Sequence, residues 1–302
     1  MKIYRSILFV VLMMSQLLYP RLHILDIEPR NVELIRSYDV EYSHISFVKI
    51  YGKIYVIKQK RKQHFDKIVS VVLDALTAHI AELFDAHIAH HVDIIPADKD
   101  FPGKPFTHWP ATIHTVAPGK MMNAQWSPYR RMNIKQQATG FRRDMLAWMS
   151  KHITLRKIVA LDTFVCNHDR HRGNLFYDAV RNIFCAIDMD SSYRYNLCAM
   201  AYQNFMKMMN DTKLKLRSNE LYALIEYKKY LEFLIQMFRP EDIIEMHDYF
   251  AAKAGFVKGS PLYASVGGEL ASNRAMIMQS YEDAQKLVGI VDQFIEKQKR
   301  LA

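Results

Sequence analysis

Residues 165–190 read VCNHDRHRGNLFYDAVRNIFCAIDMD, and this segment contains the most specific pattern of polar residues in the chain. Asp169 and Asn174 stand five positions apart, and Asp188 follows fourteen positions later. In phosphoryl transfer from a nucleotide, one carboxylate orients the acceptor hydroxyl, while an amide oxygen and a second carboxylate hold Mg²⁺ on the phosphates. The spacing predicts a loop of this kind, with Asp169 as the catalytic carboxylate and with Asn174 and Asp188 as the metal ligands.

Apolar segments flank this loop on both sides, LDTFVC at 161–166 and NIFCAI at 182–187. We expect both to be buried elements, because loops that carry function usually rest on a rigid scaffold. Arg170 and His171 are expected to brace the loop or to contact phosphate. Asp190 is the alternative second carboxylate, and we expect it to support the metal ligand that precedes it.

The chain before residue 120 has a pattern rich in strands, with one helix. The expected elements are strands at 47–51, 54–58 and 112–116 and a helix at 65–84. The two first strands alternate polar and apolar residues, and Gly52-Lys53 between them predicts a tight hairpin turn. Apolar residues recur at helical spacing over the expected helix.

Helical patterns dominate from about residue 133 onward. The expected helices lie at roughly 134–150, at 153–166 and at several places between 199 and 297. Pro240 should interrupt this pattern, with Glu241 and Asp242 in the first turn of the next helix. The segments Gly259-Ser260-Pro261 and Gly267-Gly268 indicate a late loop region.

These patterns together predict an α+β fold with two lobes. A small β-rich N-lobe over 31–120 would bind the nucleotide, and a larger helical C-lobe over 121–302 would carry the loop 165–190. A chain of 302 residues is long enough for two such lobes to share a cleft.

Lys58 ends one of the expected strands, 111 positions before Asp169. A lysine at a strand end can extend its ammonium group into a cleft and neutralise the α- and β-phosphates of a nucleotide. An acidic partner for this lysine is expected on the following helix. Asp74 is preferred over Glu82, because it lies nearer the start of the apolar repeat.

The loop that covers the phosphates should precede residue 47. The segment DVEYSHIS at 39–46 contains no glycine, although glycine allows backbone N–H groups to approach phosphates closely. Donors would therefore have to come from Ser43, His44 and Ser46. This departure predicts weaker nucleotide binding.

The formal net charge of the chain is +10, and 24% of its residues are charged. A basic balance favours an anionic partner, such as a nucleotide, an acidic protein or a phospholipid head group. Basic residues are scattered apart from KQKRK at 58–62, and no nucleic-acid-binding motif accompanies them. Nucleic acid is therefore not an expected partner.

Residues 1–25 begin with a charged MKIYR segment, and the apolar run ILFVVLMM follows it at 7–14. This order is typical of a secretory signal, although the run is short for a membrane span. The alternatives are a cleaved signal of a secreted or exported protein, an uncleaved membrane anchor, or a buried first element of a cytoplasmic protein.

The chain contains three cysteines, Cys166, Cys185 and Cys198, and no CxxC pair. This pattern argues against a disulfide framework or a zinc site. Cys166 and Cys185 are expected to be small buried hydrophobic residues. If the chain is exported, a bridge between these two becomes feasible.

The segment 165–190 resembles the catalytic segment of atypical kinases of the HipA-like and phosphatidylinositol 3-/4-kinase-like group. That group shares an N-x-D-R-H-x-x-N loop followed by an I-D metal aspartate. The matching residues are Asn167, Asp169, Arg170, His171, Asn174, Ile187 and Asp188. The segment 55–59 and the helix that carries Asp74 in place of the group's glutamate add weaker support. Residues 107–119 resemble the strand and hinge that contact adenine, and they include Val116.

The resemblance implies a protein-kinase-like fold that uses ATP and Mg²⁺. The main prediction is a serine/threonine-type protein kinase that acts on a protein hydroxyl. One alternative is the same chemistry on a phosphoinositide, which the basic run and the apolar N-terminus would suit. The other is a pseudokinase or nucleotide-binding scaffold, which the glycine-free segment favours.

Overall fold

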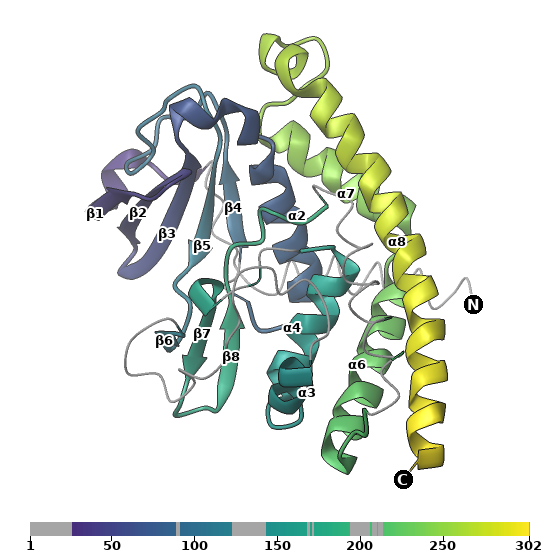
Figure 1. Cartoon of the computed structure of the whole chain (residues 1–302). Coiled ribbons are helices and arrows are strands. Elements are labelled where there is room, and N and C mark those ends of the chain that lie inside the picture. Colours follow the sequence, from purple (N-terminus) through teal and green to yellow (C-terminus); the bar gives the residue numbers. More distant parts are fainter. Residues whose placement is uncertain are drawn as a thin grey trace, which may run out of the picture.

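The computed structural model describes residues 26–88, 91–122, 143–167, 170, 172–193, 206, 210 and 214–301. The chain forms a β-rich N-terminal lobe and a larger helical C-terminal lobe (Figure 1). The predicted two-lobed α+β fold is confirmed.

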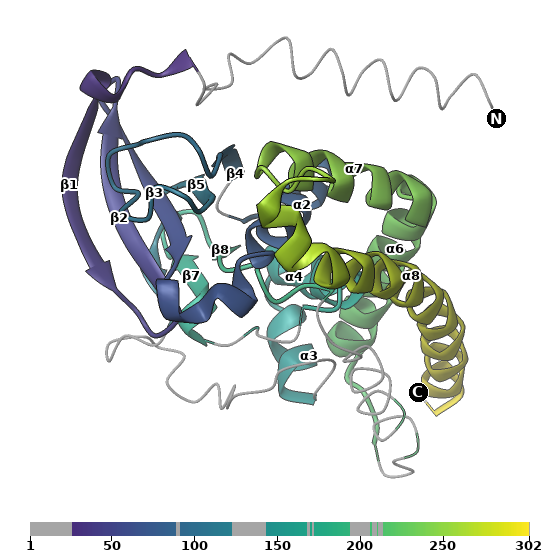
Figure 2. The ribbon, with the colours of Figure 1, turned by 90° about the horizontal axis from the view of Figure 1, so that it is seen from above.

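The N-terminal lobe is built on a five-stranded antiparallel sheet in the order β1-β2-β3-β5-β4. Its strands are β1 (Val32–Asp39), β2 (Ser43–Ile50), β3 (Lys53–Lys60), β4 (His91–Ile95) and β5 (Ala111–Thr115). The predicted hairpin joins β2 to β3, and β1 lies at the edge farthest from the helices (Figure 2). Its turn is centred on Tyr51 and Gly52, one position earlier than predicted, and both have positive φ angles of 47° and 80°. Two such residues are what a two-residue hairpin turn requires.

The two faces of this sheet have different roles, because successive side chains of a strand point to opposite sides. One face covers a small apolar core that includes Val48, Ile50 and Ile57. The opposite face of β3 carries Lys58 and Lys60 toward the helical lobe. The pairing of Ile45 with Lys58 and of Ser43 with Lys60 places these residues of β2 on the same side.

Helix α2 (Ser70–Leu83) is almost completely buried. It packs against β4 and β5 on one side and against α7 (Pro240–Lys253) on the other. Most of its buried residues are apolar, which suits a helix that is covered on both sides. It begins five residues later than predicted, because Lys62–Lys67 forms the short 3₁₀ segment η3, in which His64 has a non-helical backbone.

The link between the lobes is short. Strand β5 ends at Thr115, and β6 (Lys120–Met121) begins a three-stranded sheet with β7 (Leu175–Asp178) and β8 (Ile183–Ala186). Gly119 in this link has a φ of 84°, and a Cβ atom there would lie 2.3 Å from the carbonyl oxygen of Tyr177. Glycine is therefore required where the link passes β7.

The remaining helices form the C-terminal lobe. They are α3 (Arg143–Met149), α4 (Ile153–Phe164), α6 (Ser218–Met237), α7 and α8 (Pro261–Leu301). Helix α4 packs on α6 and α6 packs on α8, which runs along the outer side of the lobe (Figure 1). Two short 3₁₀ segments, η2 (Pro29–Asn31) and η4 (Arg172–Asn174), complete the described elements.

The helix boundaries match the prediction at Pro240 but not at the late glycines. Pro240 occupies the first turn of α7 with Glu241 and Asp242. The loop expected at Gly267-Gly268 is wrong, because both residues lie inside α8. The cost of about 1 kcal/mol for a glycine in a helix interior is small beside the packing of a 41-residue helix.

Among the described residues, no helix is long and apolar enough to cross a membrane. The N-terminal segment 1–25, for which a signal or an anchor was predicted, lies outside the described residues.

Lys104 organises the long loop between β4 and β5. Its side chain is buried, and its ammonium group donates to the carbonyl oxygens of Pro96, Ala97, Lys99 and Thr107 at 2.6–3.0 Å. The same loop is attached to β3 by Gln59, which donates to the carbonyl oxygens of Phe106 and Trp109. These polar contacts hold a segment that has no regular secondary structure.

We expect Lys104→Met to destabilise the protein by about 2–3 kcal/mol, because buried carbonyl groups would lose their donor. Chemical denaturation followed by circular dichroism measures this change. The control is Lys53→Met, which removes an exposed lysine at the start of β3. Equal unfolding midpoints for the two variants would contradict the role given to Lys104.

Candidate active site

The β7–β8 hairpin brings Asn174 and Asp188 together. Asn174 immediately precedes β7, and Asp188 follows β8 by one residue. Leu175 pairs with Ala186, and the Ile187 amide donates to the Asn174 carbonyl oxygen at 3.1 Å. The two predicted metal ligands therefore stand at the same end of one hairpin.

Lys58 joins the two lobes through this end of the hairpin. Its ammonium group donates to Oδ1 of Asp188 and, at 2.8 Å, to Oδ2 of Asp190. The lysine comes from the sheet of the N-terminal lobe, and the carboxylates follow β8 in the C-terminal lobe. Residues 130 positions apart in the chain thus form the centre of the site.

Lys60 is a member of the site that the sequence analysis missed. Its ammonium group also donates to Oδ2 of Asp190, and its side chain is only 10% exposed. The signal was present in the sequence, because residues two apart on a strand share a face. Once Lys58 is placed in the cleft, Lys60 must point to the same side.

Asp74 does not hold Lys58, contrary to the prediction. Its buried carboxylate instead accepts hydrogen bonds from Thr112 Oγ1 at 3.1 Å, His114 Nε2 at 3.0 Å and the Met189 amide at 3.2 Å. Aspartate is one methylene shorter than the glutamate of the resembled group, and it is held by its neighbours on β5. It therefore joins α2 both to the sheet and to the segment that carries the two aspartates.

The charged side chains in this cluster shift one another's pKa values. Burial alone would lower the pKa of Lys58, but Asp188, Asp190 and Asp74 together raise it well above its usual value. Burial would raise the pKa of Asp190, but Lys58 and Lys60 hold it well below the ordinary range. Burial and the neighbouring Asp190 raise the pKa of Asp188, which contacts one lysine only. Burial lowers the pKa of Lys60.

Arg170 braces the loop from inside. Its guanidinium group is buried and forms a two-pronged ion pair with Asp162 of α4, at 2.9 and 3.0 Å. It also donates to the carbonyl oxygens of Asn174 and Ile187, at 2.9 and 2.7 Å. Asn167 donates to the same Asp162 carboxylate. One arginine thus connects both strands of the hairpin to α4, and it is positioned for structure rather than for phosphate contact.

The residues predicted to cover the phosphates do not share one position. Ser43 is buried and lies beside Lys60 on the cleft face of β2. His44 lies on the other face, where its ring contacts Asp39 at 2.7 Å. Ser46 shares that other face and packs beneath Gly103. Of the three, the structure therefore brings only Ser43 to the lysines.

Val116 is 45% exposed and belongs to the link between β5 and β6, where a nucleotide base would reach the connection between the lobes. Asp169 and His171, predicted as catalytic and bracing residues, lie outside the described residues. The structure therefore does not test their roles.

Cysteine chemistry differs from the prediction at one position. Cys185 is a buried free thiol, as expected, and burial raises its pKa to about 12. Cys166 is also buried, but it is disulfide-bonded. Because Cys185 is free, the bridge between these two residues is not formed.

The donor set suits a hard divalent cation. Asp188 and Asp190 supply carboxylate oxygens and Asn174 an amide, which are ligand types that Mg²⁺ accepts when waters and substrate phosphates complete its shell. The described part of the chain contains no group of three or more histidine, cysteine, aspartate or glutamate residues that could hold a metal by itself.

Comparisons with known proteins identify a similar fold but no family. No family model matches the chain, and no curated protein matches it. Among solved structures, the proinflammatory kinase CtkA of Helicobacter pylori is similar, with a TM-score of 0.50 over 88% of this chain and 96% of that chain. The two sequences are 10% identical. At this identity the likeness shows a kinase-like fold alone.

We expect Arg170→Lys to destabilise the protein by about 3 kcal/mol, because lysine cannot replace a buried two-pronged contact. Urea unfolding followed by tryptophan fluorescence measures the loss. Arg181→Lys is the matched control, because the Arg181 side chain is 70% exposed. If both variants unfold at the same urea concentration, Arg170 does not brace the loop.

Proposed function

We propose that this chain is an ATP- and Mg²⁺-dependent phosphotransferase. The observation that carries the proposal is the contact of Lys58 with Asp188 and Asp190 across the two lobes of a kinase-like fold. In protein kinases a strand lysine that contacts the phosphates and an aspartate that holds Mg²⁺ act together in phosphoryl transfer. Asn174, whose backbone carbonyl accepts from the Ile187 amide next to Asp188, would supply a second type of oxygen ligand.

Each residue has a distinct task in this proposal. Asp188 and Asn174 would hold Mg²⁺, with Asp190 in support. Bound Mg²⁺–ATP supplies the phosphoryl group and neutralises part of its charge. Lys58 would donate to phosphate oxygens, and its contact with Asp190 would hold the ammonium group in position. Arg170 keeps the hairpin that carries the metal ligands in place.

Asp169 is proposed to orient the acceptor hydroxyl and to accept its proton. This assignment rests on its position five residues before Asn174 in the sequence. The carboxylate of such a loop acts on the nucleophile, whereas the later aspartate acts on the metal. Replacement of Asp169 should therefore impair activation of the acceptor hydroxyl, whereas replacement of Asp188 should impair binding of the metal.

The proposed acceptor is a serine or threonine hydroxyl of a protein, as the resemblance to HipA-like kinases suggests. The related phosphatidylinositol kinases make a phosphoinositide the alternative acceptor, and the net charge of +10 suits such a lipid. A catalytically weak nucleotide-binding protein is the second candidate. It is favoured by the glycine-free turn between β1 and β2.

The test is incubation of the purified chain with γ-labelled ATP, with and without Mg²⁺, and with a generic protein substrate or phosphoinositide vesicles. We expect metal-dependent labelling, which Asp188→Asn and Lys58→Met each reduce by at least about 100-fold. Asp292→Asn, an exposed change on α8, is the control. EDTA should abolish the labelling.

Other outcomes separate the alternatives. Labelling of the vesicles but not of any protein would replace the proposed acceptor with a lipid. Binding of ATP without any transfer would identify the nucleotide-binding scaffold. Folded protein that neither binds ATP nor transfers phosphate would refute the proposal.

A further inference from the structure

We propose that Lys60 is a second phosphate-binding lysine, whose charged ammonium group replaces the backbone donors that a glycine-rich turn supplies in other kinase-like folds. This inference rests on the proposed function and concerns how the same site holds the phosphates of a nucleotide. It assigns to Lys60 a role in binding the triphosphate rather than in packing the lobe.

The first argument is the position of Lys60 on β3. It shares the cleft face with Lys58, two residues earlier, and it pairs with Ser43, the first residue of β2. The turn between β1 and β2 therefore lies directly beside it. In a kinase-like fold this turn covers the phosphates, so the Lys60 ammonium group stands where they would pass.

The second argument is that the turn offers few donors of its own. The Val40 amide of this turn already donates to the Ser43 carbonyl oxygen at 2.9 Å, so this backbone donor is occupied. Residues 39–46 include no glycine that would let the backbone approach a phosphate. A lysine side chain beside the turn can supply the donors that a glycine-free backbone offers less readily.

The third argument is the charge of the cluster. Lys58 and Lys60 contact the same oxygen atom of Asp190, so two like charges are held together in a largely buried place. Their two positive charges balance those of Asp188 and Asp190, so these four side chains have a formal charge of zero, while the nearby Asp74 carboxylate contacts His114. A divalent cation at Asp188 would leave a surplus of two positive charges. A polyphosphate is the ligand that compensates such a surplus.

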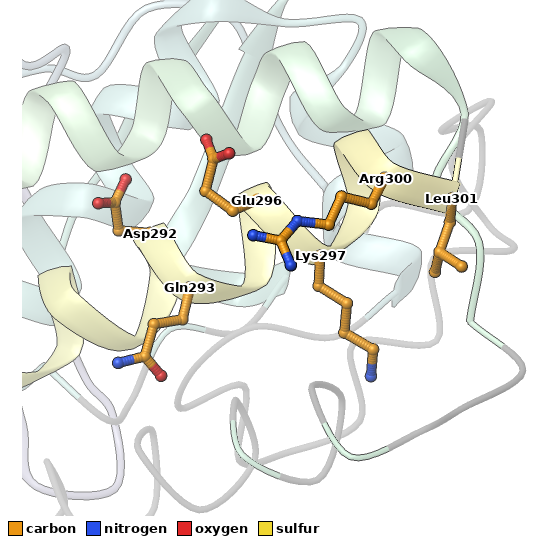
Figure 3. Close-up of a pocket in the computed structure, with 6 residues that line it drawn as sticks. All are labelled: Asp292, Gln293, Glu296, Lys297, Arg300 and Leu301. Atoms are coloured by element: carbon orange, nitrogen blue, oxygen red, sulfur yellow. The ribbon is translucent and has the colours of Figure 1, made fainter.

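The control lysine for this inference lines a surface pocket away from the cluster. The pocket has a volume of about 500 Å³ and lies near the C-terminal end of α8 (Figure 3). Its described lining mixes acids and bases on one helix, including Glu296, Lys297 and Arg300. Lys297 is exposed, so it provides a control lysine of the same charge.

The experiment is calorimetric titration of the full chain with Mg²⁺–ATP, Mg²⁺–ADP and adenosine. The variants are Lys60→Met, Lys60→Arg and the control Lys297→Met. We expect Lys60→Met to weaken the binding of Mg²⁺–ATP by at least about tenfold, with a smaller effect on Mg²⁺–ADP and none on adenosine. Lys60→Arg should stay within a few-fold of the wild type, and Lys297→Met should change nothing.

The adenosine measurement separates phosphate binding from a structural role. If Lys60 only stabilised the lobe, its removal would weaken adenosine and Mg²⁺–ATP equally, and this would overturn the inference. Unchanged Mg²⁺–ATP binding by folded Lys60→Met would also overturn it. A wild type that binds neither ligand would instead refute the proposed function, on which the inference depends.

Lys60→Met leaves one carboxylate with fewer partners and could fail to fold. The double variant Lys60→Met with Asp190→Asn keeps the formal charge of the cluster at zero. Its comparison is Asp190→Asn alone, in which both lysines remain. We expect the double variant to bind Mg²⁺–ATP at least about tenfold more weakly than Asp190→Asn, with equal adenosine binding. Equal binding of Mg²⁺–ATP by the two would overturn the inference.

Discussion

The ion-pair cluster between the lobes is the interaction on which the rest of this structure depends. Lys58 and Lys60 come from the sheet of the N-terminal lobe, and Asp188 and Asp190 come from the end of a hairpin in the other lobe. Buried charges are costly to desolvate, and leaving one without its partner costs more than the pair contributes. The cluster therefore does more to fix the relative position of the two elements than to increase overall stability.

A second set of buried polar contacts holds the charged side chains of this cluster in position. Asp74 connects α2, β5 and the Met189 amide, while Arg170 connects α4 to both strands of the β7–β8 hairpin. Because each group contacts two or three elements at once, none of the elements can shift alone without leaving a buried group unpaired. The geometry of the site is thus a property of the whole cleft rather than of one loop.

Helix α2 is held from both sides, which limits how the N-terminal lobe can move. It packs on the sheet and on α7, and the ion pair between Asp93 of β4 and Lys253 of α7 closes the same interface. The helix that carries Asp74 is therefore part of the packed core. The turn between β1 and β2 contains no glycine, so its backbone has less conformational freedom than that of a glycine-rich turn.

Local patterns were enough to predict the β2–β3 hairpin, the helical lobe and the pair Asn174 and Asp188, because strand alternation, helical spacing and loop motifs act over a few residues. The partners of Lys58 and the true contacts of Asp74 could not be read in the same way. They depend on groups that lie 38 to 130 positions apart in the chain, and on whether an aspartate is long enough to reach the lysine. The side of the sheet to which Lys60 points could be predicted from strand geometry. Its contact with Asp190, by contrast, exists only because the two lobes meet.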